Sequence, residues 1–185
     1  MSLSIQSLAI ETFVPSLRTL SKLLDKGAAY AVERKFEESV LVRARLAPDM
    51  LPLAAQVRLA CHHASDATSR LAGQGATTYG GDDKTIDEMK ARIERTIELL
   101  QGLPAAAFEG AEDREVVIPV TGVPGSERDF HMKGFQLLRD WALPHFYFHF
   151  VTAYDILRHN GVVIGKRDYL SQVGQYIRPR AGAKG

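Results

Sequence analysis

Cysteine is almost absent from this 185-residue sequence, in which Cys61 is the one example. A single cysteine cannot form a disulfide within the chain, so the fold does not depend on an oxidising compartment. Long apolar runs are missing as well, and none reaches the roughly 18 residues that a membrane-spanning helix requires. The first residues do not combine a basic segment with a following apolar one, as a signal peptide would. These absences predict a cytoplasmic protein with no membrane partner.

An excess of one charge is also missing, because 23 basic side chains balance 22 acidic ones. The net charge of +1 gives no general reason to expect a nucleic-acid partner. The sequence has no Gly-rich phosphate-binding loop, no dinucleotide-binding fingerprint and no Cys-x-x-Cys pair, which argues against the commonest cofactor classes. With 45% hydrophobic residues, the composition is that of one ordinary globular domain. We expect this domain to span residues 1–171 and a basic tail to follow at 172–185.

Four segments show the three- and four-residue spacing of apolar side chains that is typical of amphipathic helices. They cover residues 4–35, 52–71, 85–102 and 133–159. Thr85 and Glu88 form the Thr-x-x-Glu pattern of a capping box at the start of the third segment. Pro15 is expected to bend the first helix or separate its first turns, and Pro144 to kink the last helix. The pattern predicts an all-α fold, a four-helix bundle.

Two stretches between these segments lose the helical spacing. Residues 114–132 contain a run of β-forming side chains that is followed by Gly122, Pro124 and Gly125. This pattern predicts a short β-hairpin between the third and fourth helices. Because two strands are not stable alone, we expect the hairpin to lie against the helices. Residues 36–50 are expected to form a connection.

His145 and His149 stand four residues apart in the last helical segment. This spacing places both rings on one helical face, where they can bind the same metal ion. The same face carries apolar residues, so the pair is expected to point into the bundle, where ligand sites of bundles are built. The second segment offers His63 at the edge of its apolar stripe, whereas His62 lies opposite the stripe and should face water. The three candidate metal ligands are therefore His149, His145 and His63.

Interpretations without a metal stay open for these histidines. His145 follows Pro144 and could hydrogen-bond a backbone group that the proline leaves free. A buried His149 held by a tyrosine or a carboxylate would look the same in the sequence. If the three histidines do bind an ion, it is a divalent metal such as zinc, nickel or iron, with positions open for water or substrate.

Arg45 and Asp49 form a second group of candidates, in the connection before the second helix. A functional interpretation gives Asp49 the role of an orienting carboxylate and Arg45 that of an anion clamp at the mouth of the bundle. A structural interpretation lets Asp49 cap the second helix while Arg45 pairs with it or with another acid.

Aromatic residues are concentrated at positions 146–154, more than one helical face can use. Such a helix is buried in the domain or partly at a contact between subunits. The concentration predicts a homodimer. Cys61 has no neighbouring Lys or Arg to activate it and is expected to be a small buried residue.

Six short segments together resemble an uncharacterised bacterial family, a domain of unknown function within the DinB/YfiT-like superfamily. They are Ala44-Arg-Leu-Ala-Pro-Asp-Met50, Leu71-Ala-Gly73, Leu103-Pro-Ala-Ala-Ala-Phe108, Phe146-Tyr-Phe-His149, Leu157-Arg-His-Asn-Gly161 and Gly165-Lys-Arg-Asp168. The resemblance covers roughly residues 1–171. It implies a four-helix bundle, often dimeric, with a cleft at one end.

The resemblance also implies two forms of chemistry. Characterised members of the wider superfamily are similar to metal-dependent, thiol-cofactor transferases and isomerases, in which one histidine of the second helix and a His-x-x-x-His pair of the last bind the metal. His63, His145 and His149 match that order. In the closer branch the typical polar residues are matched by Arg45, Asp49, Gln56 and His149, which could form a metal-free pocket.

Three hypotheses follow from these observations. The first is a divalent-metal-dependent enzyme of the thiol-dependent transferase or hydrolase type, with its site at the bundle mouth. The second is a non-enzymatic dimeric bundle that binds a small molecule or a protein. The third is a metal-free pocket for a small-molecule ligand at the same place.

Overall fold

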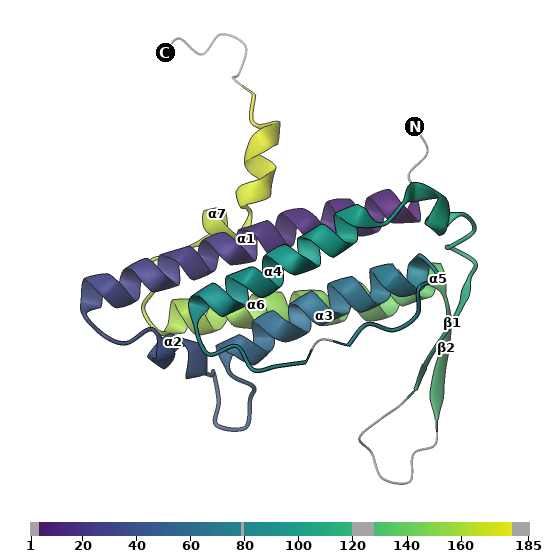
Figure 1. The fold of residues 1–185 in the computed structure, drawn as a ribbon. Coiled ribbons are helices and arrows are strands. Elements are labelled where there is room, and N and C mark those ends of the chain that lie inside the picture. The colour runs from purple at the N-terminus through teal and green to yellow at the C-terminus, as the bar shows by residue number, and fades with distance from the viewer. Residues whose placement is uncertain (1–3, 79, 120–127, 179–185) are drawn as a thin grey trace.

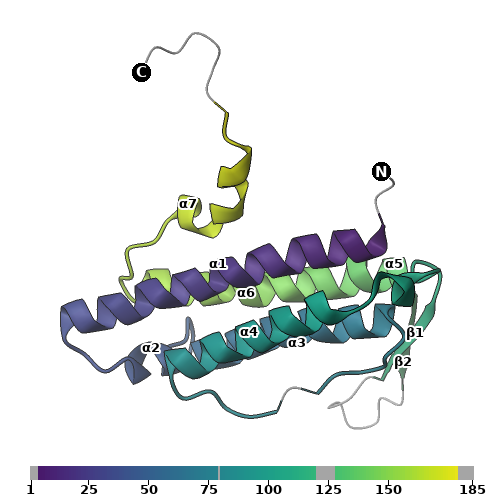
Figure 2. The same ribbon diagram turned by 45° about the horizontal axis from the view of Figure 1, so that its top comes forward.

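Four long helices lie side by side and form the body of the molecule (Figures 1 and 2). The computed structural model describes residues 4–78, 80–119 and 128–178. The long helices are α1 (Ile5–Arg34), α3 (Leu53–Leu71), α4 (Ile86–Gly102) and α6 (Leu143–His159). Fully buried apolar side chains from all four meet between them, among them Phe13, Leu53, Met89 and Phe146. The predicted four-helix bundle with a hairpin is confirmed. Within the described residues, no helix is long and apolar enough to cross a membrane.

Helix α1 runs without interruption through Pro15, so the expectation of separated first turns was wrong. A proline removes one backbone N–H, and the burial of neighbouring Phe13 and Leu17 outweighs that loss. Gly27 lies later in α1, at a contact with α6. A Cβ atom at Gly27 would lie 3.1 Å from a methyl group of the Leu157 side chain, so the glycine lets α6 approach α1 closely.

The connection after α1 contains a short helix, α2 (Ser39–Arg43), that the sequence pattern did not predict. Its two buried residues, Leu41 and Val42, pack into the core. One turn of helix is too short to show a 3.6-residue repeat, which explains why it was missed. Residues 44–52 then form a loop that leads into α3.

The end of α3 and the start of α4 are each marked by a local signal, of which the capping box at Thr85 was predicted. Gly73, just beyond α3, has a φ of 73°, a left-handed conformation that glycine adopts without strain. The hydroxyl of Thr85 accepts a hydrogen bond from the Glu88 N–H, as in a capping box. The Glu88 carboxylate, however, accepts from the N–H of Lys84 and not from that of Thr85, so the reciprocal half of the box lies one residue earlier.

The hairpin consists of β1 (Glu115–Pro119) and β2 (Asp129–Lys133), which are antiparallel and pair Glu115 with Lys133. Val116 and Ile118 are buried, and Arg70 of α3 donates to the carbonyl oxygen of Val117 at 3.1 Å. The hairpin therefore packs on the bundle at its root, as predicted. The expected turn residues Gly122, Pro124 and Gly125 lie outside the described residues.

The chain passes from the hairpin to α6 through two short elements, α5 (Gly134–Gln136) and a π-helical stretch η2 (Leu137–Ala142). The N–H of Leu143 bonds the carbonyl oxygen of Leu138, five residues back, which widens this turn. The irregularity expected at Pro144 thus takes the form of a π-helical turn directly before it.

Beyond α6 the chain forms α7 (Lys166–Tyr169) and a 3-10 turn η3 (Ser171–Tyr176). Lys26 of α1 binds the Asp168 carboxylate at 2.6 Å, and the hydroxyl oxygens of Thr19 and Ser171 lie 2.8 Å apart. These contacts hold the start of the C-terminal segment on α1. The last part of the predicted basic tail, with Arg180 and Lys184, lies outside the described residues.

A buried ion pair between Arg92 and Asp83 ties the long connection between α3 and α4 to the bundle. The Arg92 guanidinium of α4 donates to both oxygens of the Asp83 carboxylate, at 2.6 and 2.9 Å. Both side chains are buried, with 5% and 8% of their surface exposed. Because neither charge is left in water, the pair holds the end of this connection firmly against α4.

Candidate functional site

The fold brings the three predicted histidines together where α3 packs against α6. The His63 ring of α3 lies 4.6 Å from the His145 ring and 5.5 Å from the His149 ring, measured between centroids. His62 is half-buried at the edge of this group, with its ring 5.3 Å from that of His63. Throughout this article, the histidine cluster means His63, His145 and His149.

His149 is held in one tautomer by a glutamine on the neighbouring helix. Its Nδ1 lies 2.7 Å from Oε1 of Gln56, and both residues are buried. The Nε2 amide of Gln56 donates to the carbonyl oxygen of Leu51 at 3.0 Å, so its Oε1 is left to accept. Nδ1 of His149 therefore carries the proton, and Nε2 keeps a free electron pair.

The second histidine of α6 is held in the same way, although by a backbone group. Nδ1 of His145 lies 2.7 Å from the carbonyl oxygen of Trp141, in the π-helical stretch. A carbonyl oxygen only accepts, so this Nδ1 is also protonated and Nε2 is free. This hydrogen bond to a backbone carbonyl near Pro144 agrees with the interpretation of His145 that involves no metal. The same bond is also typical of metal-binding histidines, whose second nitrogen donates to a carbonyl or carboxylate.

Two rings of the histidine cluster, those of His63 and His149, are neutral at neutral pH. Burial lowers the pKa of His63 to about 3, and the positive charges that His145, His62 and His149 would carry lower it further. Burial likewise lowers the pKa of His149 to about 4, with added repulsion from His145 and His62. Neutral imidazole is the form that binds metals or accepts protons.

Two hollows open beside the cluster. One, of about 390 Å³, is lined by Pro144, His145, Phe148 and His149. The other, of about 400 Å³, includes His62 and lies between α3 and the following connection. A small molecule can therefore reach the two histidines of α6 directly from the surface.

The donor chemistry of the cluster fits a transition metal, since imidazole nitrogens suit zinc, nickel or iron. The rings, however, are stacked: the His63 plane is tilted by 26° from that of His145 and by 6° from that of His149. The in-plane electron pairs of stacked rings lie in separate, nearly parallel planes, so they do not meet at one point between the rings. Among the described residues, no three His, Cys, Asp or Glu side chains already converge to hold an ion.

Arg45 and Asp49 lie in the loop before α3 and have separate surroundings. Arg45 donates to the carbonyl oxygens of Pro48 and Met50, at 3.3 and 3.2 Å, and so closes its own loop. Asp49 is exposed and makes no side-chain hydrogen bond within the part of the chain that the structure describes. The structural interpretation was wrong for both: Pro52 is the N-cap of α3, and among the described residues Arg45 binds backbone carbonyl oxygens and no carboxylate. Their predicted functional roles remain predictions.

The loop is nevertheless linked to the histidine cluster through Gln56. The glutamine side chain accepts a hydrogen bond from His149 through its oxygen and donates one through its nitrogen to the carbonyl oxygen of Leu51, near the end of the loop. Gln56 precedes His63 by seven residues, two helical turns, so both lie on the face of α3 that meets α6. The spacing places Gln56 on the correct face of α3, but it does not identify the glutamine as the hydrogen-bond acceptor of His149.

This fold and site define a class of protein: a helical bundle with a histidine cluster shared by two helices and with a hairpin before its last helix. The chain matches the family model described as domain of unknown function DUF1993 over residues 5–170. It is also similar to a solved structure, a DinB family member protein from Shewanella denitrificans, with 34% sequence identity and a TM-score of 0.80. That match covers 90% of this chain and 91% of the other. No curated protein matches the chain.

The chain belongs to the DUF1993 family and to the DinB-type bundles. The resemblance seen in the sequence is thereby confirmed.

Proposed function

We propose that the chain is a divalent-metal-dependent enzyme whose reaction centre is the histidine cluster. The observation that carries the proposal is the hydrogen bond from Nδ1 of His149 to Gln56, with the parallel bond from His145 to Trp141. Together they leave two Nε2 atoms of α6 free, next to a third neutral histidine and beside a surface hollow. The reaction class that such a centre supports is hydrolysis or thiol-dependent group transfer.

His149 and His145 would hold the ion through Nε2, and His63 would leave its stacked position to join them. When bound, the ion would polarise a substrate or lower the pKa of water or a thiol. Gln56 keeps His149 in the required tautomer and orientation. The burial that lowers the pKa of His63 and His149 keeps both rings free of protons that would compete with a metal.

In this proposal, Arg45 and Asp49 contact the substrate from the loop before α3. Arg45 uses only Nη1 for its loop carbonyls among the described residues, so the rest of its guanidinium is available to clamp an anionic substrate group. The exposed carboxylate of Asp49 would orient a donor group of the substrate or a water molecule.

The proposal is tested by elemental analysis of protein purified without a histidine tag and then incubated with zinc, nickel or iron(II) salts. We expect about one ion per chain, lost in His149→Ala. The matched control is His159→Ala, which removes an exposed histidine from the end of the same helix. Absence of bound metal from wild type, or equal metal in both variants, would contradict the proposal.

A metal-free pocket for a small molecule is the second candidate, and the stacking of His63 on its two neighbours favours it. In this case His149 acts through hydrogen bonding alone. Screening for ligands by thermal shift separates the candidates. A ligand whose binding is lost in His149→Ala but kept in His63→Ala, without metal, identifies the pocket.

We also propose that the chain forms a homodimer through the outer face of α6. Tyr147, Phe148 and Val151 lie there with 37%, 59% and 38% of their surface exposed. Large apolar side chains on adjacent turns are typical of protein contacts. Light scattering of wild type and Phe148→Ser tests the assignment, since we expect the mass to fall from two chains to one. The exposed Val32, on α1, provides a control in Val32→Ser. A monomeric wild type would contradict the dimer.

A further inference from the structure

The geometry points to a second binding site, for a small organic anion, in a cavity between α2, α3 and the segment before α4. The cavity has a volume of about 490 Å³ and lies outside the histidine cluster. Its lining residues are Ser39, Val42, Arg43, Pro52, Ala54, Ala55, Arg58, Asp82, Asp83 and Lys84. The inference does not depend on the proposed metal centre.

The charge inside this cavity is positive once each ion pair is assigned. Of the two lining carboxylates, Asp83 is buried and bound to Arg92 through both oxygens. Asp82 stands on the rim with 89% of its side chain exposed, at 3.4 Å from Arg58. Three cations, Arg43, Arg58 and Lys84, therefore face at most one weakly placed acid.

Two nearby acids do not change this balance, because each is used by backbone groups at the start of α4. Glu38 accepts from the N–H of Ile86 at 3.3 Å, and Glu88 accepts from the N–H of Lys84. Neither lines the cavity. Within the described part of the chain, the positive charge is left without a full counter-charge.

Among the residues that the structure describes, the hydrogen-bond donors of the cations are largely unused. Arg58, with only 29% of its side chain exposed, donates through Nη1 alone, at 3.4 Å to Gly81 and 3.4 Å to Asp82. Arg43 donates to the Ser39 hydroxyl at 3.2 Å, and the Lys84 ammonium has no partner within the described ranges. A half-buried guanidinium with free donors is suited to bind a carboxylate or phosphate with two parallel hydrogen bonds.

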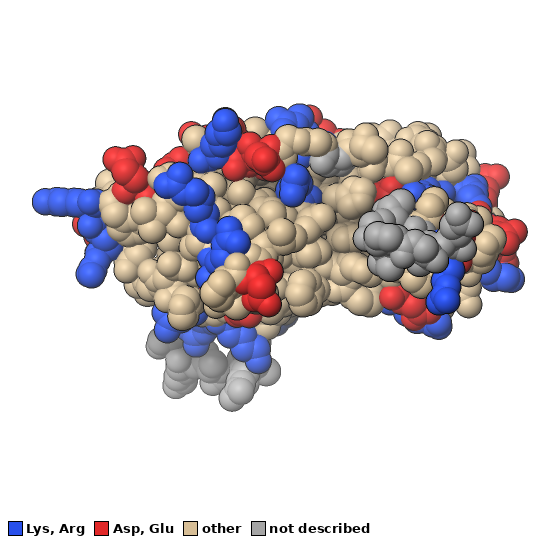
Figure 3. Space-filling view, turned by 90° about the horizontal axis from the view of Figure 1, so that it is seen from below, with Lys and Arg blue, Asp and Glu red and all other residues tan. Residues whose placement is uncertain are grey.

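Much of the remaining lining is apolar and can contact an uncharged hydrocarbon part of the ligand. Val42 and Ala55 are buried, and Pro52 and Ala54 complete an aliphatic wall. Figure 3 shows Lys and Arg side chains gathered on the end of the molecule that carries α2, around a largely uncharged surface. The site therefore fits an anion with a short apolar chain, and both a carboxylate and a phosphate ester have this chemistry.

The test is isothermal titration calorimetry of the whole protein with three probes: hexanoate, butyl phosphate and the neutral hexan-1-ol. We expect one or both anions to bind, more weakly at high salt, and hexan-1-ol not to bind. Arg58→Gln should weaken the binding about tenfold or more, because a charged hydrogen-bond partner is lost. Binding of hexanoate alone assigns a carboxylate ligand, and binding of butyl phosphate alone assigns a phosphate ester.

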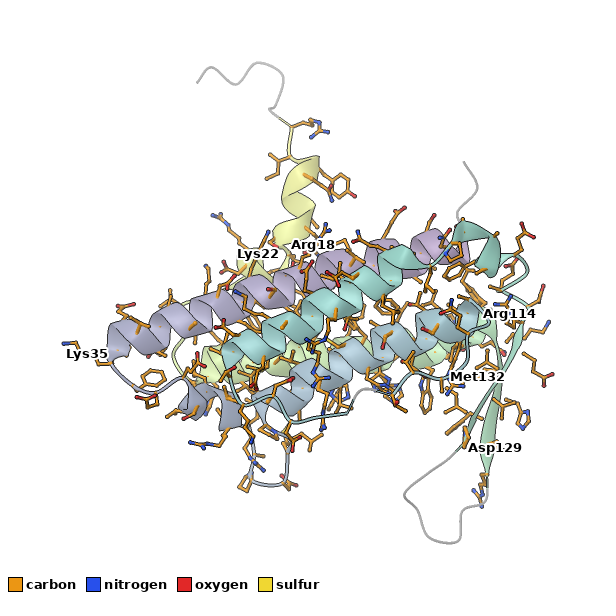
Figure 4. All side chains as sticks on the ribbon, in the orientation of Figure 1. Arg18, Lys22, Lys35, Arg114, Asp129 and Met132 are labelled. Atoms are coloured by element: carbon orange, nitrogen blue, oxygen red, sulfur yellow. The ribbon has the colours of Figure 1, made fainter. Side chains whose placement is uncertain are left out.

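Arg18→Gln is the matched control, since Arg18 is an exposed arginine on α1 beside the C-terminal segment and does not line the cavity (Figure 4). Arg43→Gln and Lys84→Gln, whose side chains make few contacts, decide the question if Arg58→Gln does not fold. The site is overturned if neither anion binds, if hexan-1-ol binds equally, or if the cavity variants bind like Arg18→Gln.

Discussion

Nδ1 of His149 and Oε1 of Gln56 lie 2.7 Å apart and join the last long helix to the second. The bond is buried, and its acceptor is itself oriented by a hydrogen bond to the loop that precedes α3. The orientation of one imidazole thus depends on the loop, on α3 and on α6 together. Any function of His149 should be sensitive to Gln56, even though the glutamine has no reactive group.

Two substitutions of Gln56 should have different effects. Gln56→Leu leaves the Nδ1–H of His149 buried without an acceptor, which should lower the free energy of unfolding by about 1–3 kcal/mol. Gln56→Glu offers a charged acceptor and should raise the pKa of His149 from about 4. Urea denaturation measures the first effect and an NMR titration of the ring measures the second. If Gln56→Glu leaves the pKa unchanged, the bond does not control the imidazole.

Acid should destabilise the metal-free protein through the histidine cluster. In the unfolded chain an imidazole takes up a proton near pH 6.5. In the folded chain His149 and His63 stay neutral until pH values near about 4 and about 3. Between these limits the unfolded state binds more protons, so their contribution to stability is complete above pH 6.5 and is lost as the pH falls. Allowing for partial exposure of the rings, we expect a loss of roughly 2 kcal/mol between pH 7 and pH 5.

The variant His63→Asn separates this effect from general acid denaturation. Asparagine does not titrate, so the loss of stability between pH 7 and pH 5 should become smaller. His131→Asn is the control, because His131 is an exposed residue of the hairpin. Equal pH dependence in wild type and His63→Asn would show that the buried ring does not couple folding to protonation.

The helices were predictable because their signals are local. The apolar spacing identified the four long helices, and Thr85 and Gly73 marked their ends through a hydroxyl cap and a left-handed turn. The pairing of His145 with His149 follows from helical geometry alone. The contact of His63 with this pair depends on how α3 packs against α6. The sequence indicated this packing only through the position of His63 at the edge of an apolar stripe.

The remaining features depend on tertiary contacts. The acceptor of His149 could not be identified as Gln56 from the residues alone, since a tyrosine or a carboxylate would serve equally well. Arg45 has carbonyl oxygens as partners, and these carry no sequence signal. The π-helical turn before Pro144 depends on how the chain leaves the hairpin and joins α6. None of these is encoded in a spacing of side chains.

Neighbouring aspartates before α4 should differ sharply in their effect on stability. Asp83→Ala leaves the Arg92 guanidinium buried without its carboxylate, which should cost about 3–5 kcal/mol. Asp82→Ala removes the same group from a side chain that is 89% exposed, and the change should stay within about 0.5 kcal/mol. Urea denaturation of the two variants makes the comparison. Similar midpoints for both would mean that the buried pair contributes no more than a surface one.

Gly134, where the hairpin enters the last helix, should not tolerate any side chain. A Cβ atom there would overlap the carbonyl oxygen of Ala111 and would lie 2.9 Å from a methyl group of Leu71. The first contact is with backbone, which cannot rotate away as a side chain can, so the hairpin or the chain around Ala111 would have to move. We expect Gly134→Ala to lower the free energy of unfolding by about 3 kcal/mol or more, through overpacking.

The control for this substitution is Gly102→Ala at the end of α4, where a Cβ atom would meet nothing within 4 Å. It should change stability by less than about 1 kcal/mol, since alanine favours the helix and no atom is displaced. Thermal unfolding followed by circular dichroism compares the two. Because Gly134 begins α5, which continues through η2 into the helix that carries His145 and His149, its variant should also disturb the NMR signals of both rings, whereas Gly102→Ala should leave them in place. Unchanged stability in Gly134→Ala would mean that the hairpin and the last helix are not closely packed at this junction.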